Sequence, residues 1–149
     1  MLTKKGKYGL KALVYLSNLP PGQLAVVADI AAKNKIPKKF LDTILGELRN
    51  AGFVQSRKGK DGGYSLARPP GDIRIGHVVR VLDGPLAPIA CASRSSYRRC
   101  EDCDEATCQV RRIMMQVRHA VADLLDNRSL AAMRDAANDD RATGLRLQL

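Results

Sequence analysis

Three amphipathic segments followed by a glycine-rich hairpin occupy the first 70 residues, and this order restricts the fold more than any other feature. Within each segment, apolar residues recur at intervals of three and four, the spacing that places them on one face of a helix. The predicted helices cover residues 2–17, 24–33 and 37–51. Pro37 suits the first position of the third helix, and Gly52 suits the residue that ends it.

A β-hairpin is predicted directly after the third helix. Its strands are Phe53–Arg57 and Tyr64–Ala67, and the glycine-rich connection between them contains Asp-Gly, a strong turn pair. Two prolines close the unit. Three helices followed by a hairpin predict a winged helix-turn-helix domain over residues 1–70. We therefore expect a mainly α fold with a small β-hairpin wing.

The second half of the chain is expected to contain a linker, a loop, a long helix and a tail. The predicted segments are the linker helix and turn over 71–88, the cysteine-rich loop over 89–104, the long helix over 105–126 and the C-terminal tail over 127–149. A short strand-like piece is expected to precede the linker helix, from residue 72. Asp104 is placed to cap the long helix. From Asn138 onward we expect a segment that is disordered or that depends on a partner for its structure.

The net charge of +10 is concentrated in the first half of the chain. Residues 1–70 hold 13 Lys and Arg against 4 Asp and Glu, whereas residues 71–149 hold 12 against 11. A like-charged surface repels itself, and an anionic partner relieves that repulsion. We therefore expect a polyanionic partner. No apolar run is long enough to cross a membrane, so we expect a cytoplasmic protein with no membrane partner.

The third predicted helix is the candidate recognition helix. Lys38 and Lys39 lie in its first turn, where a cation opposes the helix dipole, and binding of a DNA phosphate supplies a reason for that placement. We expect further phosphate or groove contacts from Lys4, Lys5, Lys7, Arg49, Arg57, Lys58 and Lys60. The alternative is a set of solvated surface charges. Two basic sites about one helix apart favour double-stranded DNA, because they can reach a major groove and the next minor groove.

Four cysteines lie close together with the spacing C-x8-C-x2-C-x4-C; they are Cys91, Cys100, Cys103 and Cys108. In a reducing compartment, clustered thiols indicate metal or cluster ligation more than a disulfide framework. The residues alone leave an iron–sulfur cluster, zinc and a metal-free thiol switch open. An enzyme that uses the C-x-x-C pair for redox chemistry is disfavoured, since no thioredoxin-like strand pattern surrounds it. A zinc-stabilised RNA-binding module is a further alternative.

The predicted long helix carries an apolar seam with the 4, 3, 4, 3 spacing of a coiled coil. Its members are Val110, Met114, Val117, Val121 and Leu124, and the seam is widened by Ile113, Ala120 and Leu125. This pattern predicts pairing of two chains in a homodimer. Burial of the seam within the same chain is the alternative.

Four motifs, taken together, resemble the IscR/NsrR/RirA/CymR-type family of bacterial winged-helix regulators. They are LTKKGKYGL at 2–10, IPKKFL at 36–41, GFV at 52–54 with GGYSL at 62–66, and the stretch from Ile75-Gly76 through Leu82 to Pro85. The resemblance covers about residues 1–130. It implies a transcription regulator, more often a repressor, that binds a pseudo-palindromic DNA operator as a homodimer.

The resemblance also implies roles for individual residues. It implies base-proximal contacts from Pro37, Lys38, Lys39, Phe40 and Asp42. An acidic residue such as Asp42 can accept a hydrogen bond from a cytosine amino group. Lys58 stands where the family often has an arginine in the wing, and lysine keeps the charge but lacks the planar fork.

For the cysteine loop, the resemblance implies a 2Fe-2S or 4Fe-4S cluster. The family's three cysteine ligands correspond to Cys91, Cys100 and Cys108, which leaves Cys103 as an extra residue and the expected fourth ligand. Some members use a histidine just after the third cysteine, but the nearest here is His119, eleven residues on. Others use an acid near the partner's N-terminus, where this chain has residues 4–8, KKGKY. Either way, this chain departs from the family pattern.

Overall fold

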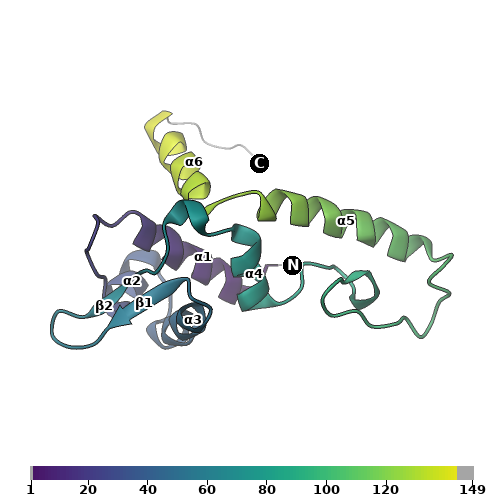
Figure 1. The fold of residues 1–149 in the computed structure, drawn as a ribbon, viewed down its shortest axis with the longest axis horizontal. Coiled ribbons are helices and arrows are strands. Elements are labelled where there is room, and N and C mark those ends of the chain that lie inside the picture. The colour runs from purple at the N-terminus through teal and green to yellow at the C-terminus, as the bar shows by residue number, and fades with distance from the viewer. Residues whose placement is uncertain (1, 144–149) are drawn as a thin grey trace.

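The computed structural model describes residues 2–143, and it confirms a mainly helical fold with a two-stranded wing (Figure 1). The winged-helix part consists of α1 (Lys4–Ser17), α2 (Val27–Asn34), α3 (Lys38–Asn50), β1 (Val54–Arg57) and β2 (Gly63–Leu66). The remainder consists of short 3-10 turns at Pro70–Asp72 and Ala90–Ala92, α4 (Ile75–Asp83), α5 (Gln109–Asp126) and α6 (Leu130–Thr143). Among the described residues, no helix is both long and apolar enough to cross a membrane.

The core of the winged-helix part lies where α1, α2, α3 and α4 meet. Leu13, Ile30, Leu41, Leu45 and Val78 are fully buried there. Each comes from the apolar face of its helix, so the three-and-four spacing in the sequence leads directly to this packing. Full burial of a side chain of this size contributes roughly 1.5–3 kcal/mol.

The turn between α2 and α3 has a left-handed residue at its centre. Lys35 follows α2 with φ 55° and ψ 47°, and it is the one non-glycine residue with positive φ in the described chain. Ile36 is buried, and Pro37 has φ −57°. Pro37 occupies the N-cap position of α3, one residue before the first helical position predicted for it. Together these residues set the angle at which α3 leaves the turn. Gly52, with φ 83°, ends α3 as predicted.

The wing depends on two adjacent glycines. β1 and β2 pair antiparallel, and Tyr64 forms an additional bridge with Ala25. A Cβ atom on Gly62 would lie 2.1 Å from the Arg57 carbonyl oxygen, and one on Gly63 would lie 2.7 Å from the Ala25 carbonyl oxygen. Both backbones approach too closely for any side chain, so glycine is required at these two positions.

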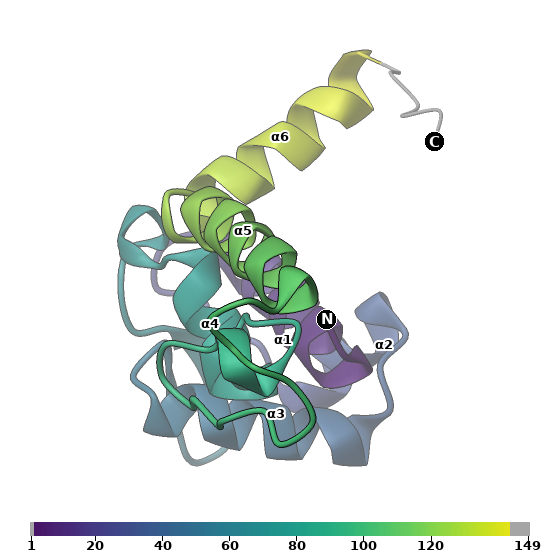
Figure 2. The ribbon, with the colours of Figure 1, turned by 90° about the vertical axis from the view of Figure 1, so that its right-hand side faces the viewer.

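The helices α5 and α6 extend away from the winged-helix part, as Figures 1 and 2 show. They are joined to it at their junction: Ile75 donates its amide to the Arg128 carbonyl at 3.0 Å, and Leu130 donates to the Ile73 carbonyl at 2.8 Å. Nearby, Arg80 of α4 forms a bidentate ion pair with Asp126 at the end of α5, with distances of 2.6 and 2.9 Å. This junction fixes the C-terminal end of α5 to α4.

Three expectations for the second half need correction. The long helix begins at Gln109 and not at 105, because Asp104 instead accepts from Ala106 in a separate turn, and the Cys108 sulfur caps the helix. The strand-like piece before α4 is a 3-10 turn with a single bridge between Arg74 and Ser129. In the described part of the tail, residues 138–143 are helical and not disordered, because α6 continues to Thr143; residues 144–149 lie outside the described residues.

Candidate DNA interface and cysteine site

The first turn of α3 presents two lysines to solvent. Lys38 and Lys39 are exposed and follow Pro37, which provides no side-chain cap for the helix amides. Neither lysine forms an ion pair within residues 2–143. Free amides, the positive end of the helix dipole and two unpaired cations together make an anion-binding surface.

The other predicted contact residues of α3 differ in exposure. Pro37, Asp42 and Arg49 are exposed. Phe40 is half-buried, and its ring meets that of Tyr8 edge-to-face at 5.7 Å between centroids. The Phe40 ring therefore holds the start of α3 against α1.

The tip of the wing supplies a second basic group. Arg57, Lys58 and Lys60 are exposed and form no ion pair with the described residues. On α1, Lys4 and Lys7 are exposed as well, but the Lys5 ammonium lies 2.7 Å from a Glu47 carboxylate oxygen. The sequence did not predict this ion pair. Because Glu47 partly neutralises the Lys5 ammonium, Lys5 is less available to bind a phosphate than Lys4 and Lys7 are.

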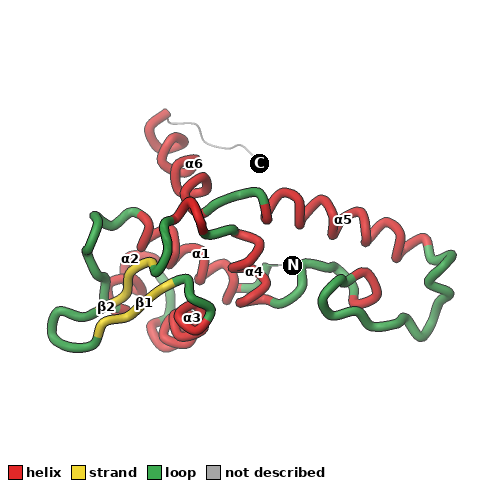
Figure 3. The backbone as a smooth tube through the Cα atoms, viewed as in Figure 1, coloured by secondary structure: helices red, strands yellow, loops and turns green. Residues whose placement is uncertain are grey.

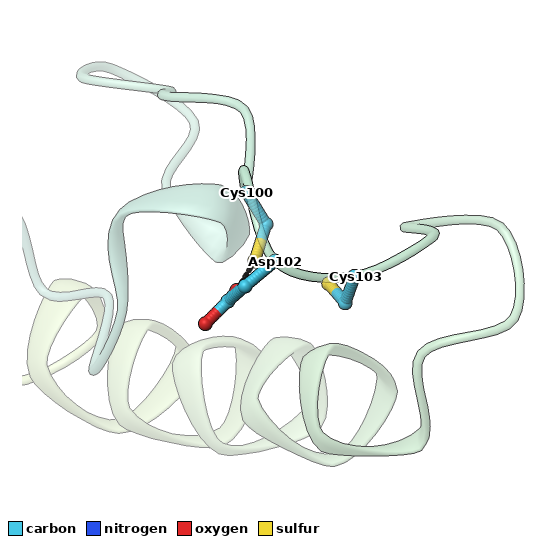
Figure 4. A group of neighbouring side chains, drawn as sticks. All are labelled: Cys100, Asp102 and Cys103. Carbon is cyan, nitrogen blue, oxygen red and sulfur yellow. Dashed lines mark hydrogen bonds between the residues drawn. The ribbon is translucent and has the colours of Figure 1, made fainter.

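The cysteine-rich loop runs between α4 and the start of α5, and Figure 3 draws it in green with one short red turn, Ala90–Ala92. The Cys100 sulfur, the Cys103 sulfur and a carboxylate oxygen of Asp102 all lie within 4.8 Å of one another. The Cys100 thiol donates to that carboxylate at 2.7 Å, the dashed contact in Figure 4. Asp102 was not among the predicted ligands, although its position inside the C-x-x-C motif could have suggested it.

Cys108 joins this cluster from the N-cap position of α5. Its sulfur accepts a hydrogen bond from the Arg111 amide at 3.4 Å, and this bond is the main cause that lowers the pKa of the Cys108 thiol. Interaction with the Cys100 thiol, followed by desolvation and interaction with Cys108, raises the pKa of Cys103 to about 12. Cys103 therefore lies close to both Cys100 and Cys108.

Cys91 lies apart from these three thiols. It is buried in the 3-10 turn Ala90–Ala92, and its sulfur is not within the group of ligand atoms that the structure brings together in the described chain. Its carbonyl oxygen accepts from the Arg111 side chain at 3.0 Å. The Cys91 turn is thus held against the first turns of α5, beside Cys108.

Two charged residues that were not predicted organise the loop. Arg111 contacts Cys108 through its amide and Cys91 through its guanidinium. Glu105 accepts from the Cys100 amide at 2.8 Å and from the Tyr97 hydroxyl, and its carboxylate lies 4.0 Å from Arg111. These hydrogen bonds lower the pKa of Glu105, and the one from Tyr97 has the larger effect, followed by the one from Cys100. One sequence feature could have indicated the contact between Arg111 and Cys108: the two residues are three positions apart, the interval between an N-cap side chain and the amide that it binds.

A basic helix start beside a basic, glycine-rich wing defines a winged-helix regulator of transcription, and the comparisons with known proteins agree. The family model Rrf2, described as an iron-dependent transcriptional regulator, matches residues 2–136. The chain therefore belongs to the Rrf2 family, as the sequence motifs indicated.

Individual relatives support the assignment. An HTH-type transcriptional regulator of Rhodobacter capsulatus, named rrf2-like, is 43% identical over 142 residues, covering 93% of this chain and 95% of the relative. The structure of CymR, the global cysteine regulator of B. subtilis, superimposes with a TM-score of 0.75 at 30% identity, covering 91% of this chain and 97% of that one. T. potens IscR superimposes with a TM-score of 0.74 at 26% identity, covering 100% and 93%.

Proposed function

We propose that this transcription regulator binds a pseudo-palindromic DNA operator as a homodimer, and that an iron–sulfur cluster on the cysteine loop controls its affinity for that operator. In this proposal, residues 1–70 form the DNA-binding domain and residues 71–88 form the linker to the rest of the chain. The cysteine-rich loop, residues 89–104, is the sensor, and α5 is the dimerisation helix. The observation that carries the proposal is the convergence of Cys100, Cys103 and Cys108 at the end of α5 farthest from its junction with α4.

The DNA contacts are assigned to the two exposed basic groups. Lys38 and Lys39 approach phosphates at the edge of the major groove, with Asp42 facing the bases, while the wing tip enters the adjacent minor groove. Arg49, Lys4 and Lys7 add phosphate contacts. Lys5 contributes less than these, because Glu47 already neutralises it. Phe40 acts through its packing on Tyr8.

The dimer is assigned to the apolar stripe that α5 leaves uncovered. Val110, Ile113, Val117 and Leu124 are 61%, 49%, 36% and 58% exposed. Met114 and Val121 are half-buried, and Val121 lines a cavity together with Leu2 and Leu10 of the same chain. The stripe therefore runs through Ile113 and Ala120 in place of Met114 and Val121. Its spacing of 3 and 4 suits pairing with a second α5.

The chemistry of the donor set fits a cluster. Thiolates are the ligands of iron–sulfur clusters, and such a cluster would supply redox sensitivity and reactivity toward oxidants. Cys100, Cys103 and Cys108 would bind it directly, and Cys91 would approach from its turn beside Cys108. Arg111 and Glu105 hold three of these four cysteines, Cys91 and Cys100 through main-chain atoms and Cys108 through its sulfur. These contacts keep the loop close to its ligating arrangement.

Zinc is the second candidate, favoured by one specific observation. Two thiols and the Asp102 carboxylate already lie within 4.8 Å of one another, and zinc accepts both sulfur and carboxylate oxygen. A site of this kind would stabilise the loop without redox chemistry.

Anaerobic purification followed by iron, sulfide and zinc analysis tests the proposal. We expect brown protein with visible absorbance, acid-labile sulfide, and an operator affinity that changes when the cluster is removed. Replacing Cys100 by Ser should abolish the absorbance, whereas replacing Ser96 by Ala, in the same loop, should preserve it. Colourless protein with stoichiometric zinc would refute the cluster and support the second candidate. Equal operator affinity with and without the cluster would refute its regulatory role.

A further inference from the structure

A polar cavity of about 160 Å³ lies between α4, the cysteine-rich loop and α5, apart from both the thiols and the DNA-binding surface. Its lining comes from four parts of the chain. α4 contributes Arg80, the loop contributes Ser93, Arg94 and Ser95, and α5 contributes Arg118, His119, Asp123 and Asp126, with Pro85–Ala87 closing one side. The charged groups that line it are therefore three guanidiniums and two carboxylates.

The distinctive member is Arg118. It is only 8% exposed, and no carboxylate of the described residues pairs with it. Among the described residues, its side chain makes one hydrogen bond, of 2.7 Å, with the neighbouring His119 ring nitrogen. Burying a guanidinium without an anion is costly. The hydrogen bond to His119 engages one nitrogen of Arg118 but brings no negative charge to it.

The two carboxylates of the lining do not satisfy this cation. Asp126 is already bound by Arg80 at 2.6 and 2.9 Å, and these bonds lower its pKa. Asp123 is exposed to solvent. Arg94, on the loop side, is exposed and likewise forms no ion pair within the described residues. The lining of the cavity therefore carries more positive than negative charge.

We propose that this cavity binds a small oxyanion, a carboxylate or a phosphate-like group, between Arg118 of α5 and Arg94 of the loop. A planar guanidinium matches two oxygens of either anion through parallel hydrogen bonds. The volume limits the ligand to a few non-hydrogen atoms beyond the oxyanion itself. A bound anion would join the loop to α5 beside the Arg80–Asp126 ion pair. The concentration of that anion in the cell would therefore affect how the cysteine-rich loop is held against α5.

Calorimetric titration of the purified protein with inorganic phosphate, sulfate and malonate, at constant ionic strength with chloride as background, tests the proposal. We expect saturable binding of one of these anions per chain, weakened roughly tenfold or more in Arg118→Met, which keeps the apolar stem but removes the hydrogen bonds. The matched control is Arg112→Met, an exposed arginine on the same helix, which should bind like the wild type.

A second variant keeps the test decisive if Arg118→Met does not fold. Arg94→Gln changes an exposed loop residue and should weaken binding by a similar factor while the circular dichroism spectrum stays unchanged. Binding that survives both substitutions but disappears in Lys38→Ala/Lys39→Ala would place the anion on the DNA-binding surface and overturn the proposal. Absence of saturable binding to the wild type would overturn it as well. Selection among the three probes identifies the ligand as planar carboxylate or tetrahedral oxyanion.

Discussion

The double substitution Lys38→Ala/Lys39→Ala gives the sharpest test of the DNA-binding surface. Both lysines are exposed at the start of α3, and neither has an ion-pair partner within residues 2–143. Each is therefore available to neutralise one phosphate. A homodimer would lose four such contacts. Since the logarithm of affinity falls with the logarithm of salt by about 0.9 per neutralised phosphate, the slope should become shallower by about 3.6.

Titration of operator DNA by fluorescence anisotropy from 50 to 200 mM salt measures this slope. Over this fourfold range, a slope difference of about 3.6 means that the wild-type affinity falls roughly a hundredfold more than that of the variant. Arg112→Ala removes an equally exposed cation from α5 and should leave the slope unchanged. A slope that is identical in the wild type and the lysine variant would refute the assignment of α3 as the recognition helix.

Three further predictions follow from the geometry. Gly62→Ala should lower the free energy of unfolding by about 1–3 kcal/mol and weaken operator binding, because its Cβ would lie 2.1 Å from the Arg57 carbonyl oxygen. Asp126→Asn should cost up to about 1 kcal/mol at neutral pH. Because Arg80 lowers the folded-state pKa of Asp126, the ion pair stabilises the protein above the unfolded carboxyl pKa, and this stabilisation disappears as the pH falls through the lower, folded value. Val117→Glu should produce monomers in sedimentation, since it places a charge in the exposed stripe of α5.

Each of these predictions has an opposing outcome, and two of them have a control variant. Gly46→Ala is the same chemical change inside α3, where nothing lies within 4 Å, and it should stabilise by about 0.5–1 kcal/mol; destabilisation by both glycine variants would contradict the steric argument. A stability difference between wild type and Asp126→Asn that grows on acidification would contradict the ion-pair argument. If Val117→Glu forms dimers as stable as those of the control Gln116→Glu, the dimer interface does not include the exposed stripe of α5.

The winged-helix half was predictable from sequence because its determinants are local. Apolar spacing located α1 and α3, and Gly52 and the wing glycines marked backbone positions that other residues adopt poorly. The exposure of Lys38 and Lys39 followed from the same helical periodicity. In these segments, the residues that decide the structure are neighbours along the chain.

The second half depends on contacts that no local pattern reveals. Arg111 holds the turn that contains Cys91, 20 residues earlier, and Arg118 is buried although a charged residue on a helix is ordinarily exposed. The helical state of the charged segment from Asn138 was missed for a related reason. α6 begins with the fully buried Leu130, and this tertiary packing starts a helix that the polar sequence beyond it does not predict.

The junction at Asp126 has a mechanical consequence. α5 is held to α4 near its C-terminal end, while the cysteine loop contacts its other end, 18 residues and about 27 Å away. The Arg80–Asp126 ion pair is therefore the point about which α5 can rotate as a rigid helix. A displacement of about 3 Å at the Cys108 end would rotate it by roughly 6°. In a dimer joined through α5, that rotation would change the distance between the two recognition helices without altering either winged domain.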